Sequence, residues 1–115
     1  MANYTLKRAT PILQVRDLGE AIEFFNGLGF SNPWGYPEYA AVAKNGEEVH
    51  LARSEETKPS MIYFVCDEVD SLWAEAQAAR IEIAAVLKDH PYGMREFTMK
   101  DPSGNVLAFA RPITP

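Results

Sequence analysis

The sequence predicts an α+β fold made of two βαβββ modules related by a pseudo-twofold axis. Two observations predict it. A strand followed by an amphipathic helix occurs twice, about fifty residues apart, and each copy is followed by extended segments joined by a strong turn signal. Each half is too small to be stable alone, so the two copies must share one core. We expect a single domain over residues 1–115, with modules over about 9–57 and 58–112.

The first copy begins with a short apolar strand at residues 12–15, preceded by a loosely held arm at residues 1–8. Asp17 can cap a helix, because its carboxylate accepts amide hydrogens of the first turn. Gly29 can end that helix in the left-handed conformation. The helix is therefore predicted over 18–28, with one apolar face formed by Leu18, Ala21, Ile22, Phe25 and Leu28.

The second copy repeats this pattern, with a strand at 61–65 rich in β-branched and aromatic residues. The helix after it is predicted over 69–79, because its apolar residues recur at the same spacing as in the first helix. These residues are Val69, Leu72, Trp73, Ala76 and Ala79.

Two turn signals define antiparallel hairpins. Asn45-Gly46 favours a two-residue type I′ turn, because both residues tolerate a positive φ. It pairs Tyr39 with Ala52, Ala41 with His50 and Ala43 with Glu48. The turn at 101–105 pairs Thr98 with Ala108 and Glu96 with Ala110. Other expected segments are a turn-rich aromatic stretch at 31–37, a partly extended one at 81–87, a loop at 88–93, and strands at 39–43, 47–52, 94–100 and 106–110.

Opposed residues of a hairpin share a face of the sheet. The face predicted to pack on the helices contains Val49, Leu51, Phe97, Met99, Leu107 and Phe109. The opposite, more polar face is predicted to contain Thr10, Gln14, Glu48, His50, Glu96 and Thr98, joined by Ser60, Ile62 and Phe64.

Composition excludes several classes of function. Hydrophobic residues make up 47% of the chain, and the formal net charge is −5 without any Lys/Arg cluster. Nucleic acids and anionic membranes are therefore not expected partners. The one cysteine, Cys66, cannot form an internal disulfide, and we expect it to be a small buried hydrophobic residue. The N-terminus lacks the apolar core of a signal peptide, and no apolar run is long enough to span a membrane, so a cytoplasmic location is expected.

Several motifs resemble the bleomycin-resistance branch of the glyoxalase/bleomycin-resistance/extradiol-dioxygenase superfamily, also called vicinal oxygen chelates. They are Ala9-Thr10-Pro11, Val15-Arg16-Asp17-Leu18, Phe24-Phe25, Leu28-Gly29-Phe30, Tyr92-Gly93-Met94-Arg95-Glu96-Phe97 and Asp101-Pro102-Ser103-Gly104-Asn105. The resemblance covers nearly the whole chain. It implies a curled mixed sheet around a cleft and a homodimer whose ligand clefts are made by both chains.

Enzymes of this superfamily hold a divalent metal on the cleft face. Carried over residue by residue, the four ligand positions are Thr10, His50, Ser60 and Ala108. Only His50 is a good donor, and sites for zinc, nickel or iron need three or more. We therefore expect no metal, no other cofactor and no catalytic residue. A site displaced onto Glu48 and Glu96 is the alternative.

The expected cleft combines aromatic residues with acids, which suits ring stacking and the binding of cations. The predicted ligand-binding residues are Trp34, Tyr36, Tyr39, Glu48, His50, Phe64, Tyr92, Arg95 and Glu96. Arg95 could instead pair with Glu96 or Asp101 on the surface.

Three functions follow from these observations. The first, and favoured, is non-catalytic sequestration of a bulky cationic, ring-bearing compound such as bleomycin, and hence antibiotic resistance. The second is a metal-dependent lyase, transferase or dioxygenase of the same superfamily, which the ligand count disfavours. The third is an interaction module with a repurposed or closed cleft. Metal analysis separates the second from the others, and titration with bleomycin separates the first from the third.

Overall fold

The computed structural model describes residues 1–114, so residue 115, the last of the predicted domain, lies outside it. The first module consists of β1 (Ile12–Val15), α1 (Leu18–Gly27), β2 (Ser31–Tyr36), β3 (Tyr39–Lys44) and β4 (Glu47–Arg53). The second consists of β5 (Met61–Val65), α2 (Val69–Ala78), β6 (Ile83–Asp89), β7 (Met94–Lys100) and β8 (Val106–Pro112).

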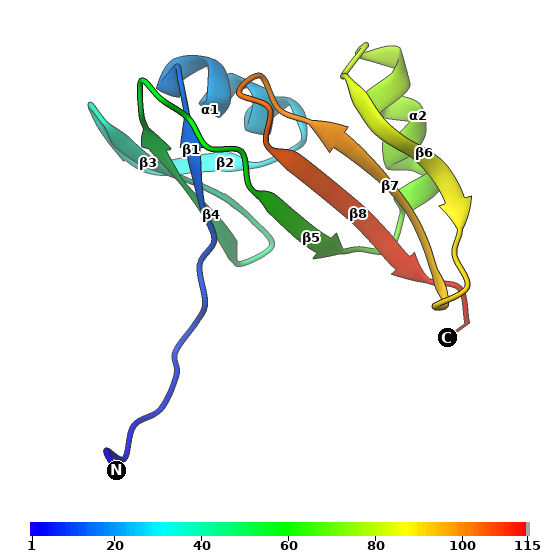
Figure 1. The fold of residues 1–115 in the computed structure, drawn as a ribbon, viewed down its shortest axis with the longest axis horizontal. Helices are drawn as coiled ribbons and strands as arrows, with labels where there is room; N and C mark the ends of the chain where they lie inside the picture. The colour runs from blue at the N-terminus through cyan, green and yellow to red at the C-terminus, as the bar shows by residue number, and fades with distance from the viewer. Residues whose placement is uncertain (115) are drawn as a thin grey trace.

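Each module forms its own four-stranded mixed sheet. Sheet 1 has the order β1-β4-β3-β2 and sheet 2 has the equivalent order β5-β8-β7-β6. The first strand of each module pairs in parallel with the last, and the other pairs are antiparallel. The sheets lie side by side, with α1 packed on sheet 1 and α2 on sheet 2 (Figure 1). The predicted pair of βαβββ modules is confirmed.

The local signals for helix ends and turns are confirmed as well. The Asp17 carboxylate accepts a hydrogen bond from the backbone amide of Glu20 at 2.9 Å, which caps α1. Gly29 has a φ of +92° just after the helix. Asn45 and Gly46 have φ values of 52° and 83°, and the β3–β4 and β7–β8 registers are those predicted.

The prediction for residues 31–37 is wrong, because this stretch forms the edge strand β2. Pro33 is compatible with an edge, where no neighbour needs its missing N–H. The Asn32 side chain donates a hydrogen bond to the backbone oxygen of Ala41 at 2.8 Å, and the register shifts between Ser31 and Trp34. The partly extended segment predicted at 81–87 is confirmed, but β6 covers Ile83–Asp89, so the first two residues of the loop predicted at 88–93 belong to the strand.

The two modules share one core through a chain of aromatic contacts. In the first module, the Phe25 ring packs edge-on against Phe30 with centroids 5.1 Å apart. Phe30 meets Phe64 of the second module at 6.1 Å, and Phe64 stacks on Phe109 at 4.9 Å. Since Phe25 is fully buried and Phe30 and Phe109 nearly so, this row joins the hydrophobic interiors of both modules.

The modules are also joined by the turn at residues 101–105. The Asn105 side chain is fully buried and donates a hydrogen bond to the backbone oxygen of Gln14 at 2.9 Å. Its Oδ1 accepts one from the backbone amide of Ser60 at 2.8 Å. Gln14 lies on β1 and Ser60 precedes β5, so one amide side chain ties together the first strands of both modules.

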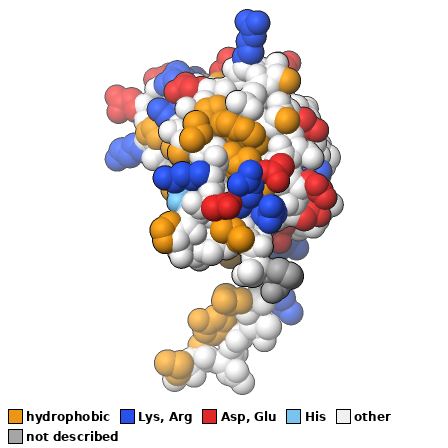
Figure 2. Space-filling model, turned by 90° about the vertical axis from the view of Figure 1, so that its right-hand side faces the viewer, with side chains coloured by type: hydrophobic (Ala, Val, Ile, Leu, Met, Phe, Trp, Pro, Cys, Tyr) orange, Lys and Arg blue, Asp and Glu red, His pale blue; other side chains and the backbone are white. Residues whose placement is uncertain are grey.

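The N-terminal arm, residues 1–9, is exposed along its length and leads away from the body of the molecule (Figures 1 and 2). It carries Tyr4 and Leu6, which are 74% and 81% exposed. Arg8 of the arm forms an ion pair with Glu48 at 3.6 Å. No helix within residues 1–114 has the length and hydropathy needed to span a membrane.

Candidate functional site

Three aromatic side chains gather on the open face of sheet 1, which is the face turned away from α1. Trp34 on β2 stacks on Tyr39 of β3, with ring centroids 6.0 Å apart and planes at 14°. His50 on β4 meets Trp34 edge-on at 5.0 Å. The register brings them together, because Trp34 and His50 both pair with Ala41, whose small side chain leaves room for the rings. Tyr36 extends this group, 6.0 Å from Trp34.

His50 is held by a hydrogen bond on each ring nitrogen. The Tyr39 hydroxyl lies 2.8 Å from Nδ1, and Nε2 lies 2.9 Å from Glu48 Oε1. A carboxylate can only accept, so in the neutral ring Nε2–H donates to Glu48 and Nδ1 accepts from Tyr39. Both nitrogens are thus engaged, and His50 would have to give up one bond to ligate a metal.

Sheet 2 presents a nearly buried carboxylate on its open face. Glu96 on β7 is 8% exposed and accepts a hydrogen bond from the Tyr63 hydroxyl at 2.8 Å. Lys88 is its cross-strand partner on β6, but within residues 1–114 no lysine, arginine or histidine nitrogen lies within ion-pair distance of Glu96. Tyr92 lies close to the same carboxylate and stacks on His90 at 4.9 Å.

Partial burial, the hydrogen bond to Glu96 and the charge of that carboxylate raise the pKa of Tyr63 to about 12. The unfolded chain therefore loses this proton near pH 10 while the folded chain keeps it. Between about pH 10 and about pH 12 the contribution of Tyr63 to stability is lost as the pH rises.

We accordingly expect the last tyrosine to ionise in an ultraviolet pH titration to be Tyr63. The transition should disappear in Tyr63→Phe and should move to lower pH in Glu96→Gln, which lacks the carboxylate charge. An unchanged titration curve in Tyr63→Phe would contradict the assignment.

The sequence prediction placed Phe64 on the wrong face. Phe64 pairs with Phe109 and Ile62 with Leu107, so both side chains point into the core. The open face of β5 instead presents Met61, Tyr63 and Val65, which are 58%, 45% and 65% exposed. Ser60 is likewise out of phase with the open face. The prediction failed by one residue of register, which moves every side chain of a strand to the other face.

Tyr63 is the site residue that the sequence prediction missed. The parallel pairing of β5 with β8 was not predicted from the sequence. This pairing sets Tyr63 opposite Ala108 and beside Glu96.

The placement of Arg95 in the cleft is also wrong. Its guanidinium donates to Asp70 of α2 at 2.8 Å and to Asp89 of β6 at 3.0 Å, on the helix side of sheet 2. Arg95 neighbours Glu96 on β7, and adjacent residues of a strand point to opposite faces. Arg95 therefore does form surface ion pairs, but its partners are Asp70 and Asp89 and not Glu96 or Asp101. The Arg95 guanidinium lowers the pKa of Asp70, and Asp70 raises that of Arg95.

The structure of residues 1–114 does not bring together a set of donors for a metal ion. Within residues 1–114, no three His, Cys, Asp or Glu side chains converge in the manner of metal ligands. Two of the four ligand positions, His50 and Ala108, lie on open faces. A third, Ser60, does not, because the open-face residue beside it is Met61. The expectation that the protein binds no metal stays a prediction, which elemental analysis of purified protein would test.

Solved structures similar to this one share its fold over nearly the whole chain. TioX from Micromonospora sp. ML1 superposes with a TM-score of 0.79 at 21% identity, covering 90% of this chain and 96% of TioX. The bleomycin resistance determinant encoded on transposon Tn5 gives 0.82 at 17% identity, covering 93% and 98%. A bleomycin-binding protein complexed with bleomycin gives 0.78 at 17% identity, covering 92% and 98%.

Sequence comparison identifies the family. No curated protein sequence matches the chain significantly. The family model for the Glyoxalase/Bleomycin resistance protein/Dioxygenase superfamily matches residues 5–109. This match covers the first module, the turn at 101–105 and the second module as far as the middle of β8. The chain therefore belongs to the glyoxalase/bleomycin resistance protein/dioxygenase superfamily.

Proposed function

We propose that this protein binds a bulky, cationic, ring-bearing small molecule between the open faces of its sheets and performs no chemistry on it. The observation that carries the proposal is the state of Glu96. Its carboxylate is nearly buried, is hydrogen bonded to a phenol, and has no ion-pair partner within residues 1–114. A desolvated charge without a counter-charge is costly, so a cationic ligand would be stabilised there.

The open face of sheet 1 supports the ring-bearing part of the proposal. Trp34 is 37% exposed and Tyr36 71% exposed, so their rings are accessible to a ligand. Because Trp34 is braced by Tyr39 and His50, little side-chain entropy would be lost on stacking a ligand ring against it. The two bleomycin proteins of similar fold give a precedent for a ligand of this class.

We further propose a homodimer, in which the open face of one chain covers that of another. Exposed apolar side chains on both sheets favour such burial: Ile12, Met61, Tyr63 and Val65 are each about half exposed or more. The projecting arm, with Tyr4 and Leu6, offers further apolar surface to a partner.

Light scattering at micromolar protein should therefore give twice the 12.9 kDa mass of one chain. A charged residue on the open face, as in Met61→Asp, should shift the mass toward that of one chain. Ala74→Asp, on the exposed side of α2, is the matched control and should leave the dimer intact. A single-chain mass for the unaltered protein would contradict the proposal.

Titration with bleomycin tests the ligand class. Binding should quench Trp34 fluorescence, and the quenching should be lost in Trp34→Phe while Trp73 still emits. If the cytoplasm is where the protein acts, its expression should also raise the bleomycin concentration that susceptible cells withstand. Absence of binding by bleomycin and by simpler cationic aromatic compounds would refute the proposal.

A further inference from the structure

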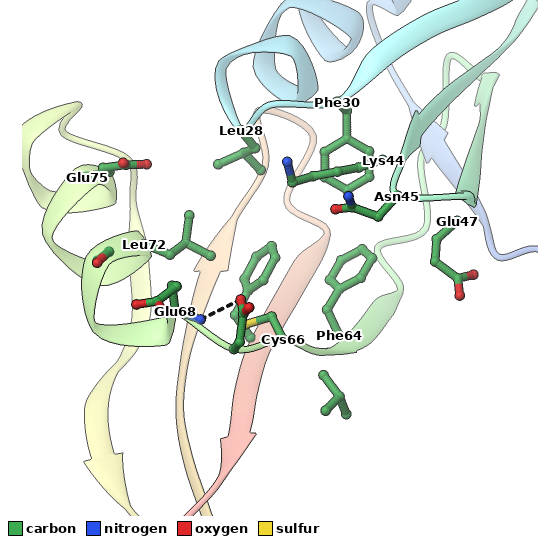
Figure 3. A pocket seen from close by; sticks show the side chains of 14 residues that line it. Leu28, Phe30, Lys44, Asn45, Glu47, Phe64, Cys66, Glu68, Leu72 and Glu75 are labelled. Atoms are coloured by element: carbon green, nitrogen blue, oxygen red, sulfur yellow. Dashed lines mark hydrogen bonds between the residues drawn. The ribbon is translucent and has the colours of Figure 1, made fainter.

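A cavity lies between the two modules, and the open-face residue that it reaches is Val65, at the end of β5. The cavity has a volume of about 340 Å³ and lies between the end of α1 and the start of α2 (Figure 3). Its apolar lining comes from both modules and includes Leu28, Phe30, Phe64, Leu72 and Phe109. The volume falls at the lower end of the range for small-molecule sites.

The apolar lining is ordered and aromatic. Phe64 is fixed by stacking on Phe109 at 4.9 Å and by the edge of Phe30 at 6.1 Å. It is only partly buried, so part of its ring faces the cavity. A preformed aromatic surface of this kind suits a hydrocarbon chain or ring.

The rim of the cavity is acidic. Glu47, Asp67, Glu68 and Glu75 line it, against the single cation Lys44. Within residues 1–114 none of these four carboxylates takes part in an ion pair. The Asp67 carboxylate accepts a hydrogen bond from the backbone amide of Glu68 at 2.7 Å, which is the dashed line in Figure 3.

Lys44 and the two carboxylates on α2 and its cap lie on different walls of the cavity. Lys44 folds over Gly29, where its Nζ would lie 3.1 Å from an added Cβ, at the C-terminal end of α1. The partial negative charge of a helix C-terminus favours an ammonium there. Glu68 and Glu75 stand on the opposite wall, on α2 and its cap (Figure 3). The N-terminus of α2 offsets part of the Glu68 charge, but no lysine or arginine of α2 lines this wall of the cavity.

We propose that this cavity binds an amphipathic amine, with its hydrocarbon part against Phe64 and its ammonium group at the Glu68–Glu75 wall. The cavity is not lined by Trp34, His50 or Glu96, so this site is distinct from the ligand site proposed on the open faces. A second copy of the chain is a poorer occupant, because a twofold contact centred on the cavity would bring two acidic rims together.

Cys66 supplies a direct readout of occupancy. It is the only cysteine of the chain, it lines the cavity, and it is half-buried there. We expect a phenylbutylammonium ion to slow alkylation of Cys66 by iodoacetamide in a saturable manner. Phenylbutanol should protect less at equal concentration, and phenylbutanoate, which has the same hydrocarbon but a negative charge, should not protect.

Variants test the sign of the electrostatic contribution. The double change Glu68→Gln and Glu75→Gln should weaken protection by phenylbutylammonium about 3- to 20-fold, whereas Lys44→Gln should strengthen it about 2- to 5-fold. The double change Glu23→Gln and Glu56→Gln makes the same charge change at exposed residues outside the cavity and should have little effect. Glu96→Gln should also leave Cys66 protection unchanged, which separates this site from the open faces.

Three results would overturn the proposal. One is equal protection by the amine, the alcohol and the acid, which would indicate nonspecific hydrophobic binding. Another is the absence of any protection by the amine. The third is protection that rises with protein concentration and is insensitive to the amine, which would indicate that a second copy covers the cavity.

Discussion

Replacing Asn105 with alanine is expected to lower the free energy of unfolding by about 2–4 kcal/mol. The side chain is fully buried and makes hydrogen bonds to the backbones of Gln14 and Ser60, at 2.9 and 2.8 Å. It also donates to Asp101 Oδ2 at 2.9 Å. Alanine would leave these partners unsatisfied at the junction of the modules, where water has little access. Urea unfolding should show a lower midpoint with an unchanged slope.

Asn32→Ala is the matched control. The Asn32 side chain also donates two hydrogen bonds to backbone oxygens, those of Trp34 and Ala41. It lies on the exposed edge strand β2, where water can replace the amide, so the loss should be below about 1 kcal/mol. Equal losses for the two variants would show that Asn105 does not join the modules. A change of slope in Asn105→Ala would indicate that the modules unfold separately.

Local physical signals account for the parts of the fold that the sequence predicted well. Asp17 and Gly29 define the ends of α1 by capping and by positive φ, which depend on a few neighbouring residues. The Asn45-Gly46 turn fixes the β3–β4 register completely, and with it the neighbours of His50. For this reason the placement of Tyr39, Glu48 and His50 on one face of sheet 1 could be predicted, whereas that of Trp34 depends on the pairing of β2 with β3.

The errors arise where non-local pairing decides the outcome. Nothing in the sequence near Phe64 shows which face of β5 meets the core, because the register is set by β8, more than forty residues away. Residues 31–37 have the composition of a turn, but β2 within this stretch pairs with β3 and forms an edge strand. Tyr63, which holds Glu96, was missed for the same reason as Phe64 was misplaced.

Replacing Glu96 with glutamine is expected to weaken binding of a cationic ligand such as bleomycin by about 1–3 kcal/mol, or about 5- to 150-fold in Kd. Glutamine keeps the size of the side chain and can still accept from Tyr63, so the fold should be preserved. The charge alone is lost. Because the group is only 8% exposed, solvent and salt would screen its interaction with a bound cation weakly.

Glu23→Gln separates this local effect from the field of the whole molecule. Glu23 is exposed on α1, so its replacement changes the net charge of −5 by the same amount without touching the open faces. Long-range attraction alone would make the two variants equal and would vanish at high salt. A direct contact predicts that Glu96→Gln weakens calorimetrically measured binding at low and high salt alike, while Glu23→Gln does not. Equal Kd values for Glu96→Gln and the unaltered protein would place the ligand away from sheet 2 and remove the main support for a cation site there.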